Sequence, residues 1–147
     1  MKNTAFLLLI SSPLLCGLPG AAFAQCGGYT DPIAGSALAG KLVCANRPGE
    51  AGDPNQRWSE MHYANGTLGE WGRGSNDAAG SYDDNVGSWS YSGASITYDY
   101  DSQYTWTLYR NPSDSSLAFC NGTSVKAEIK QANAIPSSTT LTNPCGW

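Results

Sequence analysis

The chain is poor in the side chains on which most catalytic and metal sites depend. His62 is its only histidine, and no Cys-x-x-Cys pair occurs among its five cysteines. Because a structural zinc site takes four such ligands at close spacing, we expect no metal ion, and we expect no other cofactor. The nucleophile motif Gly-x-Ser-x-Gly is also absent, and a histidine base has only one position to occupy. These absences favour a protein that is not an enzyme.

Basic residues are few and scattered. The sequence has 8 Lys and Arg residues against 12 Asp and Glu residues, which gives a formal net charge of −4 at pH 7. An acidic surface repels the phosphates of nucleic acids and of anionic membranes. We therefore expect neither nucleic acid nor a membrane surface as a partner.

The one long apolar run lies at the N-terminus. Lys2 precedes an apolar stretch at residues 5–15, and a small-x-small site follows at residues 22–24. This order is typical of a secretory signal peptide, and the run is too short for a transmembrane helix. We expect residues 1–24 to be a signal peptide and residues 25–147 to form a single periplasmic or secreted domain without a membrane span.

Four cysteines remain after such a cleavage, namely Cys26, Cys44, Cys120 and Cys145. An even number of cysteines in an exported chain predicts disulfides. Four cysteines allow three pairings. Because Cys26 and Cys145 lie near the two termini, and Cys44 and Cys120 flank the strand-rich region, we predict the disulfides Cys26–Cys145 and Cys44–Cys120.

Aliphatic side chains are scarce in the exported part. Residues 25–147 contain fourteen Leu, Ile, Val and Phe residues, a content that by itself suggests disorder. The whole sequence also has 5 Trp and 8 Tyr residues, and such rings bury large areas. We therefore expect a mostly aromatic core, stabilised by the disulfides at about 2–4 kcal/mol each.

Rings alternate with small polar residues in the sequence GSWSYSGASITYDYDS, residues 87–102. A period of two predicts strands with one buried face. We expect a hairpin of residues 86–91 and 94–100 that turns at Ser92-Gly93, and a further strand at residues 103–110.

More strands are expected on both sides of this hairpin. They are residues 41–45, a hairpin at residues 57–73 around Asn65-Gly66, and a hairpin of residues 117–120 and 124–130. About six to eight short strands joined by tight turns predict an all-β, antiparallel up-and-down meander. Because one face is aromatic and the other polar, we expect the meander to close into a small barrel, with a sandwich as the alternative.

The hairpin at residues 57–73 carries a second group of candidate residues. A two-residue Asn-Gly turn of type I′ places Glu60 opposite Trp71. One face then holds Trp58, Glu60, His62, Trp71 and Arg73, although a slip of one residue would exchange the faces. This face is a candidate recognition surface for a glycan or a protein, or a small hydrolase site that uses Glu60 and His62. The alternative is a solvent-facing hairpin with Arg73 stacked on Trp58.

Two resemblances support the fold class. Gly87-Ser88-Trp89, with the spacing to Gly93 and to the sequence ITY at residues 96–98, resembles the G-x-W strand of calycins such as lipocalins and avidins. The sequences RWSEMHYANGTLGEW, VGSWSYSGASITYDYDSQYTWTLY and FCNGT resemble those of uncharacterised exported small β-barrel proteins of Gram-negative bacteria. These resemblances imply a barrel and an exported protein, and no activity.

The rings of the central strands are also the main candidates for ligand binding. Buried Tyr hydroxyls need hydrogen-bond partners, so the rings either surround a ligand or form a plain core with hydroxyls at the barrel ends. On the first interpretation, the protein is a non-enzymatic binding protein for a small apolar or aromatic ligand. The candidate residues are Trp89, Tyr91, Tyr98, Tyr100, Tyr104 and Trp106.

Overall fold

The computed structural model describes residues 25–50, 52–53, 56–71, 82–137 and 144–146. The predicted signal peptide lies outside these ranges. The described residues form strands and one short 3₁₀ helix but no α-helix, and none of their helices is long and apolar enough to cross a membrane. In chain order the elements are β1 (Asp31–Pro32), η1 (Gly35–Leu38), β2 (Lys41–Asn46), β3 (Arg57–His62), β4 (Thr67–Trp71), β5 (Tyr82–Ser92), β6 (Ser95–Asp99), β7 (Gln103–Arg110), β8 (Leu117–Asn121) and β9 (Ser124–Ala134).

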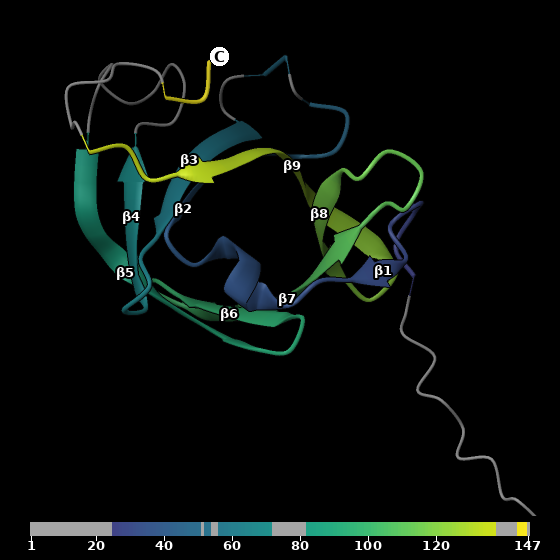
Figure 1. The fold of residues 1–147 in the computed structure, drawn as a ribbon, viewed down its shortest axis with the longest axis horizontal. Helices are drawn as coiled ribbons and strands as arrows, with labels where there is room; N and C mark the ends of the chain where they lie inside the picture. Colours follow the sequence, from purple (N-terminus) through teal and green to yellow (C-terminus); the bar gives the residue numbers. More distant parts are fainter. Residues whose placement is uncertain (1–24, 51, 54–55, 72–81, 138–143, 147) are drawn as a thin grey trace, which may run out of the picture.

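The strands β2 to β9 form one closed antiparallel barrel (Figure 1). Each strand pairs with the next one along the chain, and β9 returns to pair with β2. The predicted up-and-down barrel is confirmed. The alternative of a two-sheet sandwich is wrong, because the pairings run around a complete ring.

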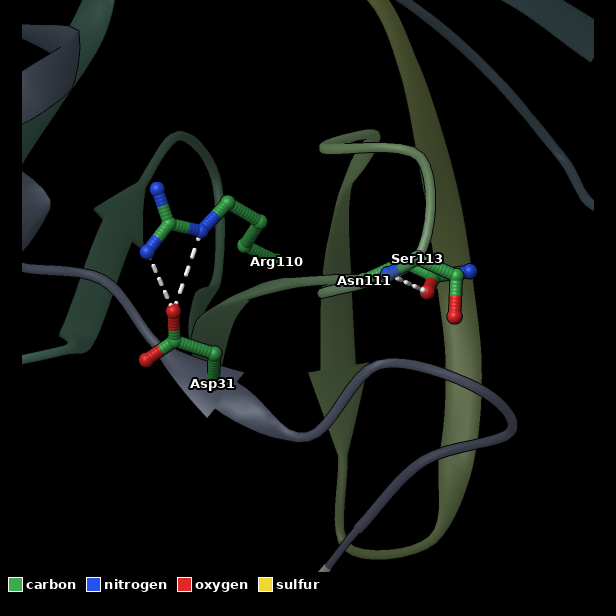
Figure 2. A network of polar contacts seen from close by, with 4 residues as sticks. All are labelled: Asp31, Arg110, Asn111 and Ser113. Atoms are coloured by element: carbon green, nitrogen blue, oxygen red, sulfur yellow. Dashed lines mark hydrogen bonds and ion pairs between the residues drawn. The ribbon is translucent and has the colours of Figure 1, made fainter.

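β1 is an additional strand that pairs with the end of β7. Asp31 lies opposite Arg110, beyond residues 103–107, which pair with β6. Arg110 donates hydrogen bonds to Asp31 from Nε and from a terminal nitrogen (Figure 2). Beside this ion pair, the Ser113 amide donates to Asn111 Oδ1 at 2.9 Å, in the turn that leads to β8. The ion pair and the β1–β7 pairing hold the N-terminal segment against the barrel.

The alternation along β6 places rings inside the barrel, as predicted. Ile96 and Tyr98 are buried, whereas Ser95 and Asp99 are exposed. Trp89 on β5 lies opposite Tyr98 and is buried with it. The inner core also contains Leu38, Val43, Ala45, Leu68, Leu108, Phe119, Ala127 and Ile129.

The two disulfides join Cys26 to Cys120 and Cys44 to Cys145. The prediction of two disulfides is confirmed, but the predicted pairing is wrong. Cys44 on β2 and Cys120 on β8 belong to clusters outside the inner core, because side chains alternate between the two faces of each strand. The C-terminal segment covers Cys44 and the N-terminal segment covers Cys120. Each terminus is therefore tied to a different part of the outer wall.

The helix η1 closes one end of the barrel. The Gly35 amide donates to the carbonyl of Gly93, after β5, at 2.8 Å, and Leu38 is buried in the inner core. A methyl group at Gly35 would lie 2.6 Å from Cβ of Tyr91 and 2.9 Å from Cγ1 of Ile96. The helix therefore packs directly on β5 and β6, and Figure 1 shows it within the ring of strands.

Candidate functional site

A cavity of about 960 Å³ lies at the barrel end opposite η1. η1 contacts the turn between β5 and β6, whereas the cavity reaches the β2–β3 loop and the β6–β7 turn, at the other end of the strands. Small-molecule sites typically measure about 300–1,000 Å³. The strands contribute Trp58, Glu60, Glu70, Val86, Tyr100, Tyr104 and Trp106 to its lining, with Tyr100 just after β6.

Charged residues surround the mouth of this cavity. They come from the β2–β3 loop, from the start of β3, from the β6–β7 turn and from β9, and both signs are present. The residues are Arg47, Glu50, Arg57, Asp101 and Lys126.

Three tyrosine rings pack against one another between the inner core and the cavity, and we refer to them as the ring stack. The planes of the Tyr98 and Tyr100 rings differ by 8°. The centroid of the Tyr98 ring lies 5.4 Å from the centroid of the Tyr104 ring. Tyr100 and Tyr104 stack on each other at 6.1 Å. Tyr98 is buried and belongs to the inner core, whereas Tyr100 and Tyr104 line the cavity. Tyr98 therefore anchors the ring stack in the core, and the other two rings border the cavity.

Two carboxylates lie on one side of the cavity. Glu60 on β3 and Glu70 on β4 are directly opposite each other across the two strands, and both line the cavity. The hydroxyl of Tyr100 donates to Glu60 Oε1 at 2.6 Å. Burial, and then the negative charge of Glu60, raises the pKa of Tyr100 well above its usual range. Tyr100 is therefore a neutral hydrogen-bond donor that positions the Glu60 carboxylate.

His62 lies in the interior, between the cavity and the closed end. It is completely buried, and its Nε2 lies 2.9 Å from the hydroxyl of Tyr98. Its ring meets the ring of Trp89 edge-on at 4.8 Å. Burial lowers the pKa of His62 to about 4, with a smaller opposing effect of the Glu60 main-chain carbonyl. The imidazole is therefore neutral at pH 7, and its Nδ1 makes no hydrogen bond within the described residues.

The β3–β4 hairpin has a different register from the predicted one. Its loop has three residues, because Tyr63 N donates to Thr67 O at 3.1 Å and Gly66 N donates to Tyr63 O at 3.0 Å. Gly66 has a φ of 89°, as the last residue of such a loop requires. Glu60 consequently lies opposite Glu70 and not opposite Trp71. This one-residue difference exchanges the faces of β4.

The predicted recognition face is therefore divided between the two sides of the barrel wall. Trp58, Glu60 and His62 face the interior, where only the first two line the cavity. Trp71 is on the outer side, 1% exposed, in a cluster that includes Cys44 and Cys145. The prediction of Trp58 and Trp71 side by side at the surface is wrong, and Arg73 lies outside the described residues.

The candidate ligand-binding residues are distributed along the barrel axis. Tyr100, Tyr104 and Trp106 line the cavity, whereas Trp89 and Tyr98 fill the core beneath it. Tyr91 shares the strand face of Trp89, whose ring centroid lies 5.5 Å from its own, but it lies at the closed end beside Gly35, is 48% exposed and does not line the cavity.

Glu70, Val86 and Trp58 were not predicted as cavity residues. Glu70 was missed because the predicted turn has two residues and the observed loop has three. The additional residue reverses the face on which the Glu70 side chain lies. The predicted strand starts at Val86, whereas β5 begins four residues earlier at Tyr82 and includes Asp83 and Asp84.

No protein-family model, curated protein or solved structure matches the chain. Among the residues that the structure describes, no three His, Cys, Asp or Glu side chains are grouped so that they would hold a metal ion.

Proposed function

We propose that the protein is an exported, non-enzymatic binding protein that takes a small planar aromatic ligand into the open end of its barrel. The observation that carries this proposal is the cavity of about 960 Å³, which is lined by Tyr100 and Tyr104 of the ring stack. Aromatic rings prefer offset-stacked or edge-to-face contacts with further rings. A flat ligand in the cavity would pack against the rings of Tyr100 and Tyr104.

The surroundings of the stack support a binding role. The ring stack is anchored, because Tyr98 is buried against Phe119 and hydrogen-bonded to His62. A site held rigidly before binding loses little conformational freedom when the ligand enters. Val86, Trp58 and Trp106 add apolar area, while Glu60 and Glu70 add polar groups on the wall. Apolar and aromatic side chains provide contact area in small-molecule sites, and polar groups among them orient the ligand.

The disulfides support a compartment outside the cytoplasm. Both of them connect a terminal segment to the barrel wall, and their presence is compatible with a periplasmic or secreted protein. We place the ligand in the same compartment, outside the cytoplasm.

The test is calorimetric titration of the purified, disulfide-bonded protein with 1-methylnaphthalene, a flat neutral probe. We expect saturable binding at one site. Tyr104→Leu removes a stacked ring and keeps an apolar side chain, so we expect it to weaken binding about fivefold, since an aromatic pair contributes about 0.5–1.5 kcal/mol.

The matched control is Tyr91→Leu, the same change at the closed end of the barrel. We expect this variant to bind the probe as the unchanged protein does. Equal weakening in both variants, or an absence of saturable binding by any planar aromatic probe, would contradict the proposal.

A further inference from the structure

We infer that the ligand carries a positive charge, which lies between the ring stack and the carboxylates of Glu60 and Glu70. This inference rests on the proposed function and specifies its ligand as a planar organic cation. The two carboxylates, the aromatic rings and the position of the basic residues point to it.

The carboxylates share one side of the cavity wall. Glu60 and Glu70 lie opposite each other on neighbouring strands, both are half-buried, and both line the cavity. Like charges directly opposite in a sheet repel each other. A cation placed between them is attracted by both, and the attraction is stronger at a half-buried site than at an exposed surface.

The aromatic side chains complete a site for a cation. Trp58 precedes Glu60 by two residues on β3, so its indole faces the same cavity. The hydroxyl of Tyr100 holds the Glu60 carboxylate beside the ring stack. The faces of Trp and Tyr rings attract cations, and such rings recognise quaternary ammonium groups in other proteins. A flat cation would meet ring faces and carboxylates at the same place.

The basic residues of the cavity lie nearer its mouth. Arg47 is on the β2–β3 loop and Arg57 begins β3, three residues before Glu60. Lys126 is exposed on β9. Among the residues that the structure describes, the cavity charges deeper on the strands are therefore the two carboxylates, which favour a positively charged ring system over a negatively charged one.

The experiment compares three probes of similar size and shape by calorimetric titration of the purified, disulfide-bonded protein. The probes are N-methylquinolinium, its neutral isostere 1-methylnaphthalene, and the anion 1-naphthoate. We expect the cation to bind about tenfold more tightly than the neutral isostere, because a charge–ring contact and two carboxylates add to the stacking. We expect the anion to bind most weakly.

The variant Glu70→Gln removes one carboxylate and keeps the shape of the side chain. We expect it to weaken binding of N-methylquinolinium about fivefold and to leave binding of 1-methylnaphthalene unchanged. The matched control is Asp99→Asn, which removes an exposed carboxylate of β6 outside the cavity. We expect it to leave both affinities unchanged.

A second measurement does not depend on any variant. Added NaCl screens charge interactions, so we expect it to weaken binding of the cation and not of the neutral isostere. Equal binding of the cation and its isostere, or tighter binding of 1-naphthoate, would overturn the inference and leave the proposed function in place. Absence of binding by all three probes would overturn both.

Discussion

The two ends of the barrel are built from the same strands but differ in what covers them. At one end, η1 packs on β5 and β6 and adds Leu38 to the inner core. At the other end, the β2–β3 loop and the β6–β7 turn border a cavity of about 960 Å³. Inward-facing rings occur at both ends. The comparison shows that a short segment before the first barrel strand makes one end a packed core, while the other end stays open.

The hydrogen-bond partners of the tyrosine hydroxyls also differ between the core and the cavity. Two tyrosines, two residues apart on the chain, direct their hydroxyls to different partners. Tyr98 meets the buried, neutral His62, and Tyr100 donates to the Glu60 carboxylate beside the cavity. In the buried pair, desolvation removes the charge from the imidazole, whereas the half-buried pair retains a carboxylate in contact with open space.

The largest expected difference concerns apolar packing. Leu38→Ala at the closed end should lower the free energy of unfolding by about 3–4 kcal/mol, because it leaves a hole in a packed core. Val86→Ala at the cavity should lower it by less than about 1 kcal/mol, since Val86 already borders open space. Urea denaturation of both variants checks this difference. Similar losses would remove the distinction between the two ends.

The second-largest expected effect is destabilisation by acid, which acts through the buried His62. The pKa of His62 is lowered from 6.5 to about 4 in the folded protein, so the unfolded chain binds the proton more readily. This stabilisation is complete above about pH 6.5 and is lost as the pH falls toward 4, by about 3 kcal/mol in total. Urea denaturation from pH 7 to pH 4 measures it. In His62→Phe this part of the pH dependence should be absent, and an unchanged profile would contradict the assignment.

The contact between η1 and the barrel provides a smaller test. Gly35→Ala places a methyl group 2.6 Å from Cβ of Tyr91, and we expect a loss of about 2 kcal/mol from overpacking. Gly52→Ala, in the loop at the open end, has no neighbour within 4 Å and should cost almost nothing. Thermal unfolding of the two variants is the measurement. A neutral Gly35→Ala would show that η1 is not firmly seated.

The smallest effect concerns the two hydroxyls. Tyr98→Phe leaves Nε2 of His62 without its partner in a dry site, and we expect a loss of about 1.5 kcal/mol. Tyr100→Phe should cost less than about 1 kcal/mol, because water in the cavity can replace the hydroxyl at Glu60. Chemical denaturation compares them. The reverse order would indicate that the closed end is the wetter of the two.

Two hairpins show how far sequence patterns could predict the site. The β5–β6 turn was expected at Ser92-Gly93, whereas Ser92 pairs with Ser95 and the loop comprises residues 93–94. This difference moves the partner of Trp89 by two residues and leaves every ring on its predicted face. In the β3–β4 hairpin the difference was one residue, so Trp71 and Glu70 exchanged faces.

The disulfide pairing could not be read from the chain for a related reason. Cys44 and Cys120 both face outward, and their partners are brought to them by terminal segments without a strong sequence period. Pairing depends on which part of the outer wall each segment covers. The position of a cysteine along the chain does not contain that information.

The sequence by itself determined the all-β class, the aromatic content of the core and the use of disulfides, because alternation, composition and turn residues act over a few neighbouring positions. Only the tertiary structure decided which cysteines pair, which face Trp71 and Glu70 occupy, and that the tyrosines divide between a closed core and an open cavity. Those outcomes depend on the register of distant strands and on the path of the segment before β2, and both are set by packing between residues far apart in the chain.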